Sequence, residues 1–124
     1  MPQKRYKTRL SCREILNLFK KGYYSVDPDT GTVYGQRGQA ITPFPCNGYL
    51  FVRLYFDGDF KRVMAVHKLV WMWVTKAPIP RSFEVHHDDE NPLNNAWVNL
   101  ICLHELDHRK VHDKRGTGEA EIPF

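Results

Sequence analysis

The stretch Glu84–His112, EVHHDDENPLNNAWVNLICLHELDHRKVH, holds five of the six histidines of this 124-residue chain. Near its end, His108 and His112 stand four residues apart in a segment that reads as a helix. On a helix this spacing places two imidazoles on one face, where both can point at the same ion. The end of the stretch therefore predicts part of a metal site.

The beginning of the same stretch predicts a hairpin. His86 and His87 end a short apolar strand, Phe83–Val85. Residues 88–95 have the composition of a turn, and Val98–Leu103 reads as a returning strand. Strand, loop, strand and helix then follow one another, which predicts a ββα unit with histidines at both ends.

The two adjacent histidines are predicted to have different tasks, because neighbouring strand residues point to opposite faces. We expect His86 to face the helix and a metal ion, and His87 to meet a water molecule. Hydrolysis of a phosphodiester needs a cation that neutralises charge and a base that activates water, and neutral imidazole is a common metal ligand. Three histidines for a metal and one for a water meet both needs.

The order of these residues resembles that of the HNH endonucleases, whose shared core is a ββα-metal finger. The resemblance rests on the histidine pair, on the Asn99 of an N-L pair, and on histidines nine and thirteen residues after that Asn. EVHH followed by HxxxH looks like the colicin-type DNases in particular. The resemblance implies that His86, His108 and His112 bind one divalent metal ion (Mg²⁺, Mn²⁺, Zn²⁺ or Ni²⁺), that His87 is the general base, and that Asn99 braces the loop and the base.

A second resemblance covers more of the chain. VHKLVWMWV at Val66–Val74, followed by VHHDDENPLNN and VNL, is similar to the HNH proteins of phages and mobile introns. Glu90 stands where that family usually has Gly, and the zinc-ribbon cysteine pairs of many HNH proteins are absent. Together the resemblances imply an α+β fold, in which an N-terminal helix and antiparallel β-hairpins lead into a ββα-metal (His-Me finger) nuclease core. They also imply a homing or nicking enzyme that acts on double-stranded DNA as a monomer or homodimer.

The length of the chain predicts a single domain. We divide it into a basic arm and helix (1–22), a β-hairpin region (23–66), a helix (67–76), the ββα-metal core (83–113) and a tail (114–124). A capping-box sequence at Ser11–Glu14 predicts the helix Cys12–Lys21. Residues 35–47 are predicted to be a loop with at most a short strand at Ala40–Thr42.

Two turns predict hairpins in the middle of the chain. The turn Asp27–Gly31 joins Tyr23–Val26 to Thr32–Tyr34. The Asp57-Gly58 pair joins Tyr49–Phe56 to Phe60–Val66 and is the strongest hairpin signal in the chain.

Basic residues gather at the N-terminus, where Met1–Lys21 has seven Lys and Arg residues against one Glu in a chain of net charge +4. A polyanion is expected to bind at this end first. The predicted contacts to DNA phosphates are Lys4, Arg5, Lys7, Arg9, Arg53 and Arg62. For the last two, which alternate with apolar residues and predict a sheet with one basic face, the alternative is a solvated strand.

Two histidines have open roles. His67 either packs or caps a helix, or contacts DNA. His104 either lies one turn before His108, within reach of the metal, or ends the returning strand, and we do not count it as a ligand.

Two alternative functions remain open, and the cysteines and apolar runs bear on the cellular location. A structural zinc module that binds nucleic acid without cutting it would need a fourth ligand, Asp107 or His104. An RNA nuclease or a toxin-like nonspecific DNase is a further alternative. An odd number of cysteines without a CxxC pair and the lack of a long apolar run predict a protein of the host cytosol, with no membrane contact.

Overall fold

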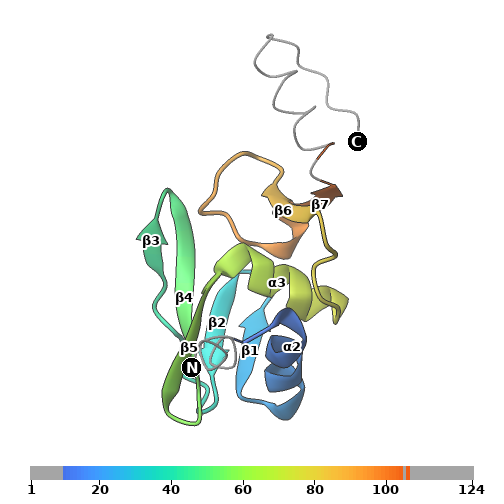
Figure 1. Ribbon diagram of the computed structural model, residues 1–124. Coiled ribbons are helices and arrows are strands. Elements are labelled where there is room, and N and C mark those ends of the chain that lie inside the picture. Colours follow the sequence, from blue (N-terminus) through green and yellow to red (C-terminus); the bar gives the residue numbers. More distant parts are fainter. Residues whose placement is uncertain (1–9, 105, 107–124) are drawn as a thin grey trace.

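The computed structural model describes residues 10–104 and residue 106 (Figure 1). Two α-helices, a 3-10 turn and seven strands follow in the order α2 (Cys12–Lys21), β1 (Tyr24–Asp27), β2 (Thr32–Gly35), β3 (Phe44–Cys46), β4 (Tyr49–Phe56), β5 (Asp59–Ala65), α3 (Val66–Thr75), β6 (Phe83–His87), η1 (Trp97–Asn99) and β7 (Leu100–His104). The strands form three antiparallel sheets, β1–β2, β3–β4–β5 and β6–β7. The fold class is α+β, as predicted.

The N-terminal helix α2 begins and ends where the sequence predicts. The hydroxyl of Ser11 accepts a hydrogen bond from the Glu14 amide, and the Ser11 amide donates to the Glu14 carboxylate at 2.8 Å. These reciprocal bonds satisfy amides that have no partner inside the helix. Gly22 ends the helix in the left-handed conformation, with a φ of 85°, which a residue without a Cβ adopts easily.

Both predicted hairpins are confirmed to within about one residue. At the tip of β4–β5, Asp57 and Gly58 both have positive φ, at 57° and 83°, which matches the twist of the flanking strands. The short strand β3 was not predicted, because the Gly and Pro residues before Pro45 and the lack of helical periodicity indicate a loop over residues 35–47. Proline cannot donate a ladder hydrogen bond, but β3 lies at the edge of its sheet, where proline is tolerated. The strand expected at Ala40–Thr42 is only a single bridge between Ala40 and Tyr34.

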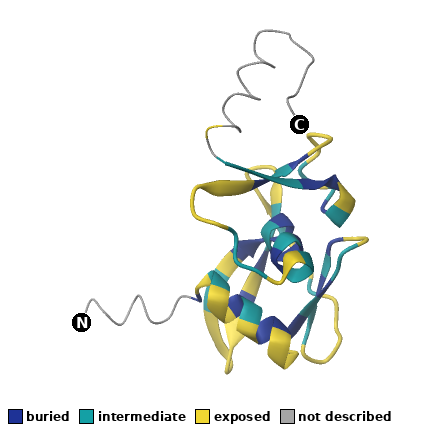
Figure 2. Cartoon of the chain, turned by 90° about the vertical axis from the view of Figure 1, so that its right-hand side faces the viewer, coloured by how far each residue is buried: buried dark blue, intermediate teal, exposed yellow. Residues whose placement is uncertain are grey.

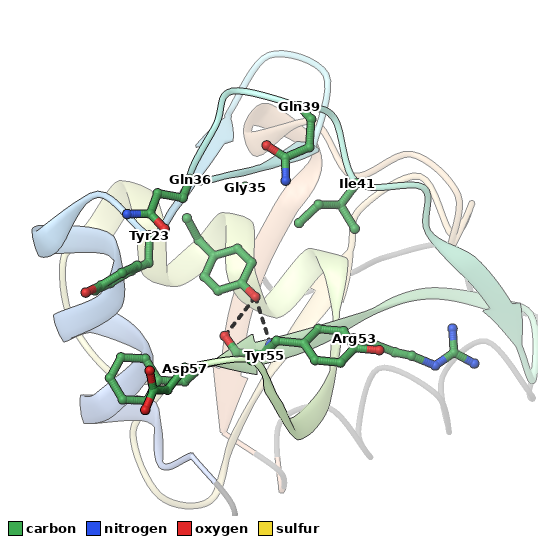
Figure 3. A pocket seen from close by; sticks show the side chains of 11 residues that line it. Tyr23, Gly35, Gln36, Gln39, Ile41, Arg53, Tyr55 and Asp57 are labelled. Atoms are coloured by element: carbon green, nitrogen blue, oxygen red, sulfur yellow. Dashed lines mark hydrogen bonds between the residues drawn. The ribbon is translucent and has the colours of Figure 1, made fainter.

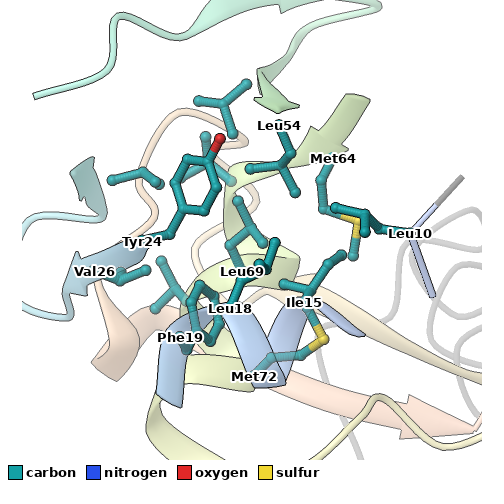
Figure 4. Close-up of a cluster of buried hydrophobic side chains, with 14 of the residues drawn as sticks. Leu10, Ile15, Leu18, Phe19, Tyr24, Val26, Leu54, Met64, Leu69 and Met72 are labelled. Carbon is teal, nitrogen blue, oxygen red and sulfur yellow. The ribbon is translucent and has the colours of Figure 1, made fainter. Parts of the chain in front are cut away.

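The helix α3 lies in the middle of the molecule, where it contacts α2, β1, β4, β5, β6 and η1. Its residues Leu69, Val70 and Met72 are fully buried, and Figure 2 shows the buried part of α3 between the sheets. A helix that is apolar on most sides is stable only when other elements cover it. The core around it also includes Ile15, Leu18, Phe19, Tyr24, Val26, Leu54 and Met64 (Figure 4).

The hairpin β6–β7 carries the histidine pair, with His87 opposite Leu100 and Phe83 opposite His104. The returning strand begins two residues later than predicted, because residues 97–99 form the 3-10 turn η1. The helix predicted for His108 and His112, the arm 1–9 and the tail 114–124 lie outside the described residues. Within residues 10–104 and 106, no helix has the length and apolar character needed to cross a membrane.

The central position of α3 leads to a stability prediction. Replacing Leu69 by Ala should lower the free energy of unfolding by about 2–5 kcal/mol, the usual cost of a cavity at a fully buried leucine. Val98→Ala removes two methyl groups from a side chain that is 90% exposed and should change it by less than about 0.5 kcal/mol. Urea unfolding of both variants measures this, and equal losses would contradict the central role of α3.

Candidate active site

Three of the histidines meet at one cleft. His67 at the start of α3 and His86 and His87 at the end of β6 line a cleft of about 560 Å³. Strand β4 contributes Tyr49 and Phe51 to its wall. The remaining lining residues are Asn47, Ala65, Lys68, Glu84, Val85, Glu90 and Pro92. The cleft thus joins the central helix, the middle sheet and the β6–β7 hairpin.

The side chain of His87 is buried, with 4% of its surface exposed. Its Nε2 lies 2.8 Å from Oδ1 of Asn95, and its ring is 4.8 Å from that of His67 and 6.0 Å from that of Tyr49. Along β6 the buried residues Val85 and His87 alternate with the more exposed Glu84 and His86. The predicted opposite orientation of the two histidines is therefore confirmed, but His87 reaches water only through the cleft that it lines.

The loop after β6 is tied to Asn99. The Asn99 carbonyl accepts from the Asp88 amide at 2.7 Å, and its side-chain oxygen accepts from the Asp89 amide at 3.0 Å. Its side-chain nitrogen donates to the Asp89 carboxylate and to the Asn94 carbonyl, both at 2.9 Å. Asn99 therefore connects both ends of the loop, which is the bracing geometry expected from the sequence.

The carboxylate of Asp89 also holds this loop together by accepting hydrogen bonds. The sequence predicted only a turn here. Hydrogen bonds from the Asn94 side chain, the Asn91 amide and the Asn99 side chain hold the pKa of Asp89 below its usual value. The signal that could have revealed it is the alternation of Asp and Asn in DDENPLNN, since such side chains bond nearby backbone amides.

The ring of His67 is buried, with 7% of its surface exposed, and it also packs against Tyr49. Its Nδ1 has no hydrogen-bond partner among the described residues. Burial, followed by the charges of His87, Lys68 and His86, lowers the pKa of His67 to about 3. The ring is therefore neutral at physiological pH, and its burial supports the packing role.

The ring of His104 packs edge-on against Phe83, with the ring centroids 5.3 Å apart. Its Nδ1 accepts a hydrogen bond from the Leu106 amide at 3.2 Å. His104 thus ends strand β7, which is one of its two open roles, and the structure gives it no place at the cleft.

The two arginines of the middle sheet do not share a face, contrary to the predicted basic face. Arg62 pairs with the fully buried Leu54, whereas Arg53 pairs with the exposed Val63. Arg62 donates from Nη1 to the Leu10 carbonyl at 2.8 Å, and the guanidinium of Arg53 lies 4.1 Å from the ring centroid of Phe44. Only Arg53 presents its charge on the outer face, because successive strand residues alternate between faces.

A larger cavity, of about 700 Å³, lies between the ends of the β1–β2 and β4–β5 hairpins (Figure 3). Tyr24 closes its inner side, where the hydroxyl donates to the Tyr55 carbonyl and accepts from the Tyr55 amide. Arg53 lines this cavity, but no histidine does, and Asp57 is its one carboxylate. It therefore lacks the groups for hydrolysis, and the smaller cleft is the better candidate.

The predicted metal ligands can be compared with the structure only in part. His86 is described and lies at the cleft, while His108 and His112 lie outside the described residues. Among the residues that are described, no three His, Cys, Asp or Glu side chains are close enough together to hold a metal ion. The imidazole of His86 at the cleft wall is of a ligand type suited to divalent transition-metal ions.

The segment of the chain that contains most of this cleft is similar to a known protein family. Residues 64–110, which contain the histidine pair, the bracing Asn99 and His108, match the family model described as HNH endonuclease. This segment of the chain is similar to the HNH endonucleases. No curated protein matches the sequence.

Among solved structures, this chain is similar to the HNH homing endonuclease I-HmuI, whose structure concerns DNA binding and cleavage. The two are 26% identical, with a TM-score of 0.62 over 82% of this chain. The match covers 56% of the I-HmuI chain, so this sequence spans little more than half of that protein. The likeness extends beyond residues 64–110 and therefore includes most of the N-terminal half.

The low pKa of His67 predicts a loss of stability in acid. An unfolded histidine titrates near 6.5, so below that pH the unfolded state binds a proton that the folded state does not. Above about pH 6.5 both states leave His67 unprotonated, and its titration does not affect stability. As the pH falls from there towards 3, the extra proton bound by the unfolded state should lower the free energy of unfolding by about 1.4 kcal/mol per pH unit. His67→Phe should flatten this dependence relative to the unchanged chain in urea titrations of the metal-free protein. Parallel pH curves for the two proteins would show that His67 can be protonated in the fold.

Proposed function

We propose that this protein is a metal-dependent endonuclease of the phage or intron type that hydrolyses phosphodiester bonds of double-stranded DNA. The observation that carries the proposal is the arrangement at the end of β6. There His86 and His87 lie on opposite faces of one strand at one cleft, and the bracing Asn99 ties the loop that follows them. Because the two adjacent side chains point in different directions, one can bind a metal ion while the other acts on a water molecule.

The choice of DNA as substrate is supported by similarity and by charge. I-HmuI, which this chain resembles over 82% of its length, binds and cleaves DNA. The cleft contains the cation Lys68, and Arg53 lies on the same outer face of β4 as Tyr49 and Phe51, which line the cleft. DNA could thus run along the outer face of β4 towards His87, with the basic N-terminal arm adding phosphate contacts.

In the proposed reaction, His87 accepts a proton from a water molecule in the cleft. The hydroxide oxygen forms a bond to phosphorus while the bond between phosphorus and the 3′-oxygen breaks. The 3′-oxygen then takes up a proton, which leaves a 5′-phosphate and a 3′-hydroxyl. Asn99 maintains the loop that holds His87 in position.

His86, together with His108 and His112, would hold the divalent ion, Mg²⁺, Mn²⁺, Zn²⁺ or Ni²⁺. When bound there, such an ion neutralises charge on the phosphate and on the leaving oxygen. A closed structural zinc site would need a fourth protein ligand. His104, one of the two candidates, instead accepts a hydrogen bond at the end of β7, which favours the catalytic proposal.

The first functional prediction separates the base from the ligands. His87→Ala should retain metal and DNA binding but lose cleavage by about two to four orders of magnitude, the usual contribution of a positioned base. His86→Ala, His108→Ala or His112→Ala should lose metal binding as well. Calorimetric titration with Mn²⁺ or Ni²⁺, alongside cleavage of plasmid, phage and host genomic DNA with and without chelator, measures both properties. Cleavage that resists chelator would contradict the proposal, and loss of metal binding in His87→Ala but not in His86→Ala would reverse the two roles.

The second functional prediction concerns DNA affinity. Replacing Lys4, Arg5, Lys7 and Arg9 by Ala should flatten the slope of log K against log salt by up to about 3 to 4, because each lost phosphate contact lowers it by about 0.9. Arg53→Ala should lower the slope by about 0.9 more. Arg62→Met is the matched control, since Arg62 bonds Leu10 rather than facing outward, and it should reduce stability without changing the slope. An unchanged slope in the four-residue variant would show that the arm makes no phosphate contact.

A further inference from the structure

The hydrogen bond between Asn95 and His87 is formed between two buried side chains, each with 4% of its surface exposed. Asn95 lies in the loop between β6 and β7, where the sequence suggested only a turn. Its Oδ1 can accept but not donate a hydrogen bond. With the oxygen of Asn95 as its partner, Nε2 of His87 is the ring nitrogen that carries the hydrogen.

Asn95 is held in place by a glycine from the other half of the chain. A Cβ atom on Gly31 would lie 2.7 Å from the Cβ of Asn95 and 2.9 Å from its carbonyl oxygen. No side chain fits at such distances, and Gly31 also has a positive φ of 77°. The turn between β1 and β2 thus presses its backbone directly against Asn95.

The same turn makes a second contact two residues further along the loop. The Pro28 carbonyl accepts from the Trp97 amide at 2.7 Å, and the ring of Trp97 packs against Trp71 of α3 at 5.0 Å. The turn is itself closed by a bond from the Gly31 amide to the Asp27 carbonyl at 2.8 Å. Residues 95–97 are therefore clamped between the β1–β2 turn and α3.

We propose that Asn95, seated by the β1–β2 turn, is a positioning residue that fixes the tautomer of His87. With the hydrogen on Nε2, the lone pair on Nδ1 is left for a water molecule in the cleft that His87 lines. The contact with Asn95 uses Nε2 alone. This inference rests on the proposed role of His87 as the base, and it makes Nδ1 the atom that takes the proton.

The β1–β2 turn that holds Asn95 lies outside residues 64–110, the segment that matches the HNH family model. Gly31 and Pro28 precede the matched residues 64–110 by more than thirty positions, so the N-terminal hairpin supports the base from a part of the chain that the family model does not cover. The other tautomer is disfavoured, because its Nε2 would face the buried oxygen of Asn95 without a hydrogen between them.

The test reads the tautomer directly and needs neither DNA nor metal. In ¹⁵N spectra of histidine-labelled protein at a pH where the rings are neutral, the unchanged chain should show His87 with its hydrogen on Nε2 alone. His87→Gln identifies the signal. Asn95→Ala should show a mixture of both tautomers. Its single-turnover cleavage rate should fall roughly tenfold to hundredfold, as for other residues that orient a functional histidine. The Kd values for DNA and for the metal should not change.

Substitutions at Gly31 and Gly38 form a matched pair of variants. Gly31→Ala and Gly38→Ala impose the same backbone strain, because their φ values are 77° and 78°, but nothing lies within 4 Å of a Cβ on Gly38. Only Gly31→Ala should alter the His87 signals and the cleavage rate. If Gly31→Ala does not fold by circular dichroism, Asn95→Ala still decides the question.

Three outcomes would overturn the inference: a tautomer mixture in the unchanged chain, an unaltered spectrum in Asn95→Ala, or equal effects of Gly31→Ala and Gly38→Ala. A protein with the single Nε2–H tautomer, lost in Asn95→Ala, that cuts no DNA would support the contact and contradict the proposed function. The two proposals therefore fail in distinguishable ways.

Discussion

Burial of α3 is the constraint on which the rest of the structure depends. The sheets around it have only two or three strands each, and isolated sheets of that size are marginally stable in water. Because α3 contacts β1, β4, β5 and β6, it gives all three sheets a common apolar surface. The first turn of the same helix places His67 at the cleft, so the element that stabilises the fold also forms part of the site.

The loop between β6 and β7 depends on polar contacts instead. Asp89 and Asn99 exchange hydrogen bonds across its base, and the β1–β2 turn holds its far side at Asn95. Glu90 has a left-handed conformation, with a φ of 62°. Such a residue is strained by about 1–3 kcal/mol, and the surrounding bonds offset this strain and keep the loop in one shape beside His87.

Local signals in the sequence predicted most of the fold. The capping box at Ser11 determined the start of α2 through neighbouring atoms, and the Asp57-Gly58 pair determined the hairpin through its backbone preferences. The edge strand β3 was not predicted, because its pairing with β4 is a tertiary contact that the Gly and Pro residues before it do not reveal. The face on which Arg62 lies was also not predicted, because a register shift between Leu54 and Tyr55 pairs Arg62 with Leu54 instead of with Arg53.

The sequence by itself predicted the kind of chemistry, because the histidine pair and Asn99 are close in sequence and their spacing is local. It also determined that His86 and His87 point in opposite directions, which follows from the period of a strand. Only the tertiary structure decided what surrounds His87. His67, Tyr49 and Gly31 lie 20 to 56 positions away in the sequence. They meet the site because α3, the start of β4 and the β1–β2 turn lie against the β6–β7 hairpin and its loop. Contacts of this kind depend on how elements dock, which no local spacing specifies.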